Sequence, residues 1–155
     1  MLCDSIRDPR DLAQLVHLSL ATNTRLELTG SSISPNHPKV LNIISSWLPG
    51  FKDSPNLKLV RESADLFKRV KELKKKGFAV VGTSSHEGSN LFGANLSKGK
   101  HAIVFGTETS GLSEAKMRAM DVMLRVPMKN GAKFFTLGTV VPVFTYEALR
   151  QKNIL

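Results

Sequence analysis

The sequence contains a single cysteine, Cys3, among its 155 residues. One cysteine cannot form a disulfide within the chain, and such low usage is typical of a reducing compartment. No apolar run approaches the roughly 18 residues that a membrane-spanning helix needs, and the amino-terminal segment meets a charge at Asp4, unlike a secretory signal peptide. We therefore expect a cytoplasmic protein with no membrane partner, or a protein of an organelle matrix if a presequence has been removed.

Acidic residues are scarce relative to basic ones. The chain has 22 lysines and arginines against 13 aspartates and glutamates, a formal net charge of +9. This excess favours a polyanionic partner, for which RNA is the natural candidate, although a basic chain can also simply reflect solubility. The densest basic cluster lies at residues 61–76, where Leu66, Phe67, Val70 and Leu73 repeat at helical spacing. Its basic side chains decorate the outer face of an amphipathic helix, which serves either as a solvated face or as a track for RNA.

Apolar runs suited to buried strands alternate with stretches of helical periodicity along the whole chain. This alternation is typical of an α/β fold with a mostly parallel sheet and helices on both faces. The length fits one domain, which we place at residues 1–155. Because a proline is tolerated best in a first helical turn, Pro142 predicts that the last helix begins near Thr139. The predicted strands are 2–6, 25–29, 57–60, 78–83, 102–105 and 122–126, and the predicted helices are 9–22, 38–46, 63–75, 113–120 and a last one reaching Gln151.

The segment FGTETSGLS at residues 105–113 follows a predicted strand and leads into a predicted helix. Gly106 and Gly111 bracket its loop, and backbone without a Cβ can approach a ligand closely. Ser113 is a suitable N-cap for the following helix, with Lys116 one turn inside it. These features predict a small-molecule site built largely from main chain. The segment is neither a nucleotide P-loop, since no Lys-Ser/Thr pair follows the second glycine, nor a three-glycine dinucleotide site.

Metal ligands and reactive thiols are poorly represented. The histidines, His17, His37, His86 and His101, are scattered along the chain and Cys3 stands alone, so the pattern predicts no metal site. A carboxylate beside a thiol raises the pKa of that thiol, so Cys3 next to Asp4 is not a convincing nucleophile.

Four segments resemble, in order and wording, the motifs of the SpoU/TrmH branch of the SPOUT RNA methyltransferases. FGTETSGLS at residues 105–113 matches the family pattern FG-x-E-x-x-GL-S/P, and VPM at residues 126–128 matches I/V-PM. A YE pair stands at residues 146–147, and DPRDLAQLVHL at residues 8–18 is a weaker form of the first motif. The matches run from near the start to near the end of the chain, so the resemblance covers essentially the whole predicted domain.

The resemblance implies a carboxy-terminal trefoil knot from about residue 102 onward. The knot would gather the loop 105–113, the strand end at 126–128 and the turn before the last helix around S-adenosylmethionine. The resemblance also implies methylation of a ribose 2′-hydroxyl of tRNA or rRNA, and a homodimer whose first and last helices pack against their mates and complete each site at the interface. The positions that match cofactor-binding residues of the family are Thr83, Gly106, Val126, Met128 and Phe135.

Several positions depart from the family pattern. His17 stands where the family has the arginine proposed to activate the hydroxyl, and Asp11 stands where it has asparagine. The family's third motif, S-L-N-V-S, falls on FFTLG at residues 134–138, so its asparagine and both serines are absent. With Glu108, which by resemblance orders the loop or reaches the neighbouring subunit, His17 and Asp11 make up the candidate catalytic group.

Two hypotheses fit these departures. In the first, the protein is a divergent 2′-O-methyltransferase in which His17 serves as the base in place of the arginine. In the second, the domain is catalytically inactive and acts as an RNA-binding or assembly module, since a lone helical histidine is more often structural than catalytic. Arg7, Arg10, Lys39 or the basic helix are candidates for RNA recognition, with phosphate contacts supplying salt-sensitive affinity. The short chain resembles relatives that modify tRNA, especially its anticodon loop.

Overall fold

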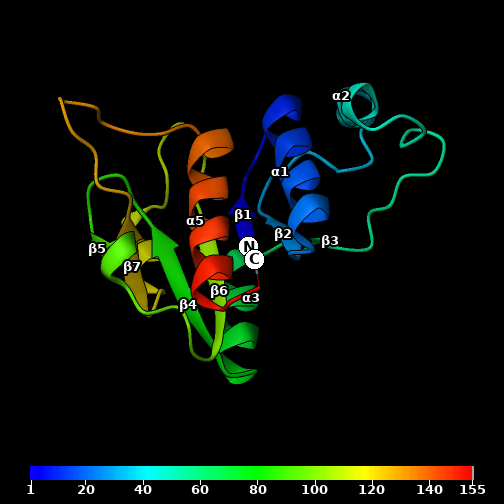
Figure 1. Cartoon of the computed structure of the whole chain (residues 1–155). Coiled ribbons are helices and arrows are strands. Elements are labelled where there is room, and N and C mark those ends of the chain that lie inside the picture. The colour runs from blue at the N-terminus through cyan, green and yellow to red at the C-terminus, as the bar shows by residue number, and fades with distance from the viewer. Residues whose placement is uncertain (155) are drawn as a thin grey trace.

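The structure, a computed structural model, describes residues 1–154 as a parallel sheet covered by helices (Figure 1). All strand pairs are parallel, and the strand order is β3-β2-β1-β6-β4-β7-β5. The strands are β1 Leu2–Asp4, β2 Leu26–Thr29, β3 Val60–Glu62, β4 Phe78–Thr83, β5 Ser89–Asn90, β6 Lys100–Phe105 and β7 Val122–Arg125. The helices are α1 Pro9–Thr22, α2 Pro38–Trp47, α3 Leu66–Lys75, α4 Glu114–Arg118 and α5 Leu137–Gln151, with a short 3-10 helix, η1, at Leu91–Gly93.

Helices cover both faces of the sheet, as the sequence predicted. Successive side chains of a strand point to opposite faces, so β6 sends Ala102 and Val104 into one core and Ile103 and Phe105 into the other. The larger core contains apolar residues of α1, α2 and α5, and the smaller one contains those of α3 and of the α4 region. Figure 1 shows α1 and α5 side by side on the face of the sheet that carries the larger core. The α/β prediction with helices on both faces is therefore confirmed.

Helix α1 has the predicted bounds because both of its ends carry local signals. The Asp8 carboxylate accepts hydrogen bonds from the backbone N–H of Arg10 at 2.7 Å and of Asp11 at 3.3 Å, and Pro9 occupies the first turn. The helix ends at Asn23, which adopts a left-handed conformation with φ 50°. One side of the helix is buried, from Leu12 through Leu15 and Val16 to Ser19, while Leu20 is half-buried.

Helix α5 begins earlier than predicted, and the expected place of Pro142 is wrong. Thr136 has extended backbone at φ −64° and ψ 160° and acts as the N-cap, and its carbonyl accepts from the N–H of Val140 at 2.9 Å. Because the helix starts at Leu137 rather than near Thr139, Pro142 lies in its second turn. The missing N–H of Pro142 therefore leaves one helical carbonyl near the start of α5 without its usual donor.

The two edge regions of the sheet were predicted less well. The predicted strand 57–60 is displaced to β3, because this edge strand pairs through Val60 and two exposed polar residues, Arg61 and Glu62. The predicted helix 63–75 starts later, at Leu66, since Asp65 is its N-cap and accepts from the Lys68 N–H at 2.8 Å. Strand β5 was missed altogether, and α4 is shorter than the predicted 113–120.

The trefoil knot remains a prediction of the resemblance, with which the strand order is consistent. Within residues 1–154, the structure has no helix that is both long enough and apolar enough to cross a membrane.

Candidate functional site

A cavity of about 620 Å³ opens where neighbouring strands of the sheet end. Strands β4, β6 and β7 are parallel neighbours, so their carboxyl ends meet at one edge, and the segments 83–87, 105–112 and 126–128 that follow them all line the cavity. Ligands of open α/β sheets bind at such edges. The start of α5 closes another side. The five predicted cofactor residues all line this cavity, namely Thr83, Gly106, Val126, Met128 and Phe135.

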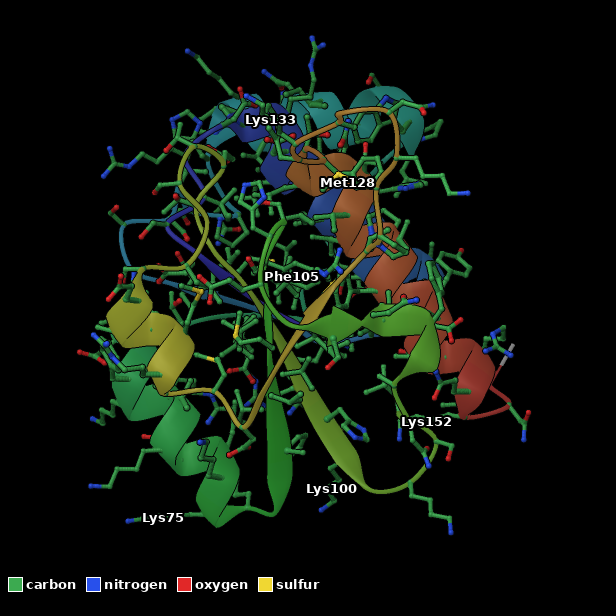
Figure 2. The ribbon with its side chains drawn as sticks, turned by 90° about the vertical axis from the view of Figure 1, so that its left-hand side faces the viewer. Lys75, Lys100, Phe105, Met128, Lys133 and Lys152 are labelled. Atoms are coloured by element: carbon green, nitrogen blue, oxygen red, sulfur yellow. The ribbon has the colours of Figure 1, made fainter. Side chains whose placement is uncertain are left out.

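Hydrogen bonds between the strand ends hold the floor of the cavity. The Thr83 hydroxyl donates to the carbonyl of Val104 in the adjacent β6 at 3.0 Å. The N–H of Ser84 donates to the carbonyl of Leu124 in β7 at 3.1 Å. Figure 2 shows Phe105 at the end of β6 and Met128 beyond it, on the side of the molecule where Lys133 also lies. The site is thus built on the ends of rigid, paired strands.

The loop after β6 is closed on itself. Thr107 and Gly111 exchange two backbone hydrogen bonds, of 3.1 and 3.0 Å, and the Thr107 hydroxyl accepts from the N–H of Ser110. A Cβ placed on Gly106 would lie 2.0 Å from the Gly111 carbonyl carbon. Gly111 itself has φ 67°, a conformation that favours glycine. The sequence predicts that these glycines let a ligand approach the backbone. In the structure, the absence of a Cβ on Gly106 makes room for the backbone of Gly111 in the same loop.

Glu108 connects this loop to the first motif. Its Oε1 accepts from the backbone N–H of Asp8 at 3.4 Å, and Asp8 in turn caps α1. Residues 100 positions apart in the sequence are thereby brought together beside the cavity, which Glu108 also lines. This contact fits the expected role of Glu108 in ordering the loop.

A buried ion pair beside the loop was not anticipated from the sequence. The Lys116 Nζ lies 2.6 Å from Oδ2 of Asp4, whose side chain is 2% exposed. The other carboxylate oxygen, Oδ1, accepts from the hydroxyl of Thr29 at 2.8 Å. Because Lys116 belongs to α4, which follows the loop directly, the pair fixes that end of the loop to the end of β1. Asp4 could have been noticed in the sequence because it is a charged residue at the end of an otherwise apolar strand.

The other two candidate catalytic residues lie outside the cavity. The ring of His17 packs edge-on against Trp47 of α2, with centroids 5.8 Å apart and an interplanar angle of 72°. Asp11 lies in the first turn of α1, where burial and then the neighbouring Asp8 raise the pKa of its carboxyl. Neither residue lines the cavity of its own chain among residues 1–154. The catalytic roles of His17 and Asp11 therefore stay predictions.

Two titratable cavity residues were missed by the sequence reasoning. His86 and Glu87 line the wall after β4, and the backbone N–H of each donates to the hydroxyl of Ser84, at 3.1 and 3.0 Å. Their position directly after the carboxyl end of a predicted strand was the signal that could have found them. With Glu108, they are side chains in the cavity that can accept a proton.

The third motif forms an aromatic wall in place of a polar one. Phe134 and Phe135 line the cavity, yet they are 68% and 41% exposed, so they border the space rather than fill it. Leu137 and Val140 at the start of α5 extend this apolar side. The wall suits the flat apolar face of a nucleoside.

Potential metal ligands are not clustered in the described part of the chain, and its cysteine is buried. Among residues 1–154, no group of three or more histidine, cysteine or acidic side chains is placed to hold a metal ion. Cys3 is buried, and burial foremost raises the pKa of its thiol to about 12, so the thiolate is strongly disfavoured.

Comparison with known proteins identifies the same family that the motifs lining the cavity resemble. The family model of the SpoU rRNA Methylase family matches residues 1–146. The chain belongs to this family. Among curated SpoU relatives, the 23S rRNA (guanosine-2'-O-)-methyltransferase RlmB of Ralstonia nicotianae is 26% identical over 91 residues, which are 59% of this chain and 36% of the relative. The tRNA (guanosine(18)-2'-O)-methyltransferase of Borreliella burgdorferi is 32% identical over 83 residues, 53% of this chain and 38% of the relative.

Solved SpoU structures share the fold. The SpoU methyltransferase AviRb from Streptomyces viridochromogenes, in complex with AdoMet, has a TM-score of 0.80 and 21% identity, and the match covers 98% of this chain and 57% of that one. A structure from work on the 2-OH methylation of C/U34 on tRNA has a TM-score of 0.80 and 22% identity, covering 99% and 95% of the two chains. The chain spans between about a third and a half of the length of the curated relatives it matches.

Proposed function

We propose that this SpoU family member is an RNA methyltransferase that uses S-adenosylmethionine to methylate a ribose 2′-hydroxyl of tRNA or rRNA. The observation that carries the proposal is the convergence of two family motifs, at residues 105–113 and 126–128, on one cavity at the strand ends. Its curated relatives are named for 2′-O-methylation of 23S rRNA and of tRNA. The net charge of +9 supports an RNA substrate.

The cavity residues fit a nucleoside cofactor. The cavity volume of about 620 Å³ is within the range of roughly 300–1,000 Å³ usual for small-molecule sites. Main chain of the closed loop at Gly106 offers polar groups, while Val126, Met128 and Phe135 offer apolar surface for an adenine ring. S-adenosylmethionine, when bound, supplies a methyl group already activated on a sulfonium. The part left to the protein is to hold, orient and shield the reactants.

Methylation also requires the hydroxyl to lose its proton. Within one chain, His86, Glu87 and Glu108 line the cavity and are available as acceptors. His17 can take this role only if a second copy of the chain carries its α1 to the cavity, since its own ring rests on Trp47. The His17 hypothesis is therefore tied to the proposed homodimer, in which α1 and α5 meet their mates.

A catalytically inactive RNA-binding module is the second candidate. It is favoured by the aromatic wall of Phe134 and Phe135, which replaces polar positions of the third motif. The two candidates can be distinguished because only the enzyme transfers a methyl group to RNA.

The deciding experiment is incubation of the protein with methyl-labelled S-adenosylmethionine and total RNA, followed by nucleoside analysis. We expect label in a 2′-O-methylated nucleoside of tRNA or rRNA, together with cofactor binding by calorimetry. The Gly106→Ala variant, in which the loop cannot close, provides the matched blank. Binding of RNA without any transfer of label would establish the module instead.

A further inference from the structure

Five lysines lie near the amino ends of β4 and β6, at the end of the sheet opposite the cavity, and we call this group the basic edge. They are brought together by strand register, since Phe78 at the start of β4 pairs with Lys100 at the start of β6, and α3 ends at Lys75 just before β4. The side chain of Lys152, after α5, donates to the carbonyl of Gly99 at 2.7 Å. Figure 2 shows Lys75, Lys100 and Lys152 on one side of the molecule, away from Met128 and Lys133. The basic edge consists of Lys75, Lys76, Lys98, Lys100 and Lys152.

Most of the charge of the basic edge is not neutralised within the protein. Lys75, Lys76, Lys98 and Lys100 are exposed, and within residues 1–154 none of these four lies in an ion pair with a carboxylate side chain. The nearby acids are already engaged: Asp121 pairs with Lys74 at 2.7 Å, and Glu72 pairs with Arg69 at 2.9 Å.

Lys100 and Lys152 are restrained by contacts with neighbouring residues. The Nζ of Lys100 lies 5.8 Å from the ring centroid of Phe78, a cation–π contact that restrains the side chain. His101 lies next along β6, and burial, followed by the charge of Lys152, lowers the pKa of its imidazole. An anion bound to the lysines would oppose the effect of Lys152 on this pKa.

We propose that the basic edge binds the phosphate backbone of the substrate RNA, away from the nucleotide that enters the cavity. The inference rests on the proposed RNA substrate. Lysine ammonium groups act as point charges and bind phosphates without reading sequence. Four of these lysines come from two segments joined by register, which suits a run of phosphates better than one small anion. A six-residue strand spans about 20 Å, so an RNA stem that reaches both sites must lie along the sheet.

The test compares pairs of charge-neutralising substitutions that remove equal charge. The Lys75→Gln/Lys76→Gln and Lys98→Gln/Lys100→Gln variants each remove two charges from the basic edge. The Lys52→Gln/Lys58→Gln variant removes two exposed charges from the loop between α2 and β3 and serves as the control. Affinity for bulk tRNA and for deproteinised ribosomal RNA is measured by filter binding between 0.05 and 0.2 M salt, about the range over which phosphate contacts are strongly salt-dependent.

We expect each basic-edge variant to bind the RNA that the wild type methylates roughly tenfold more weakly at low salt. The slope of log affinity against log salt should fall by about 1.4 to 1.8, the value for two lost phosphate contacts. The control should keep the wild-type slope, and all variants should keep wild-type affinity for S-adenosylmethionine. In the wild type, the same RNA should raise the pKa of His101, followed by NMR of its ring protons.

Wild-type RNA affinity in either basic-edge variant would overturn the inference, as would an equal loss in the Lys52→Gln/Lys58→Gln control. These outcomes leave the proposed function standing if the wild type still methylates RNA. A wild type that neither binds S-adenosylmethionine nor labels RNA would remove the proposed function itself, and the inference with it.

Discussion

Gly106 and Gly111 touch through their backbones: a Cβ on Gly106 would fall 2.0 Å from the carbonyl carbon of Gly111 and 2.3 Å from its oxygen. Contacts this short are with main chain, which cannot move aside as a flexible side chain can. The FG and GL parts of the family motif therefore depend on each other sterically. The proposed binding of S-adenosylmethionine at this loop therefore depends on closure of the loop.

The Gly106→Ala variant should lose affinity for S-adenosylmethionine and some stability. A methyl group forced into a packed site typically costs about 1–3 kcal/mol, and here the loop at Thr107 must open to accept it. Calorimetric titration and thermal unfolding measure the two effects. Gly93→Ala is the control, because a Cβ at Gly93 meets nothing within 4 Å and needs no unusual φ. Equal behaviour of the two variants would refute the steric argument.

Removal of Lys116 should destabilise the protein because Asp4 would be left buried without its partner. Breaking a buried ion pair from one side typically costs about 3–5 kcal/mol, and we expect about 2–3 kcal/mol for Lys116→Met because Lys116 is partly exposed. The Asp4→Asn/Lys116→Met double variant should recover part of this loss, since the amide can still accept from Thr29. Urea unfolding of the wild type, both single variants and the double variant gives the coupling. Strictly additive losses would show that the pair is not coupled.

Glu147 of the YE motif should contribute stability that disappears in acid. Hydrogen bonds from Arg150 first and Gln151 second lower the pKa of its carboxyl from 4.5 to about 2. A carboxyl with a depressed folded-state pKa stabilises the fold above its unfolded pKa, and this contribution is lost as the pH falls from about 4.5 to about 2. The Glu147→Gln variant should melt below the wild type at pH 7, and the gap should narrow at pH 3. A gap independent of pH would contradict the assignment.

The His17 hypothesis predicts loss of methyl transfer without loss of fold. His17→Phe keeps an aromatic ring against Trp47 but removes the base, so transfer should fall by roughly 10²- to 10⁴-fold while the melting temperature changes little. His86→Ala, on the cavity wall, is the comparison. Full activity of His17→Phe would exclude His17 as the base, and loss in His86→Ala alone would transfer the role to His86.

Sharing of the site between subunits gives a further expected outcome. If His17 acts across a dimer, mixing His17→Phe subunits with Gly106→Ala subunits should restore part of the activity, because one of the two sites in a mixed dimer is then intact. Measurement of transfer in the mixture, against each variant alone, checks this. Transfer no greater than the sum of the separate variants would indicate that each site uses residues of one chain only.

Elements with local signals at both ends were predictable from the sequence. The bounds predicted for α1 agree with the structure because Asp8 and Pro9 mark its first turn. Those of β4 agree because its apolar run follows Gly77, which has φ 77°. Strand β5 had no such signal. Ser89 and Asn90 are polar and exposed, and they form a strand only because β7 lies beside them.

In the site too, features with local sequence signals could be predicted and features that depend on distant residues could not. That Gly106 and Val126 line one cavity could be predicted from the sequence, because they follow apolar strands and parallel strands end together. The contact of Lys116 with Asp4 spans 112 residues, so it depends on the finished sheet order and no local pattern reports it. His17 was placed by motif matching alone; in the structure its ring packs against Trp47 and does not line the cavity of its own chain.

The position of β6 in the sheet has a consequence for synthesis. Strands β1, β2 and β3 form one group, and β4, β7 and β5 form another, and the two groups are joined only through β6. While the chain is being translated, the groups cannot unite until residues 100–105 have left the ribosome and entered the gap between β1 and β4. Pairing across such long sequence separations is slow. The strand that supplies the floor of the cavity is therefore also the one that unites the two halves of the sheet, and β7, which is synthesised later, then inserts between β4 and β5.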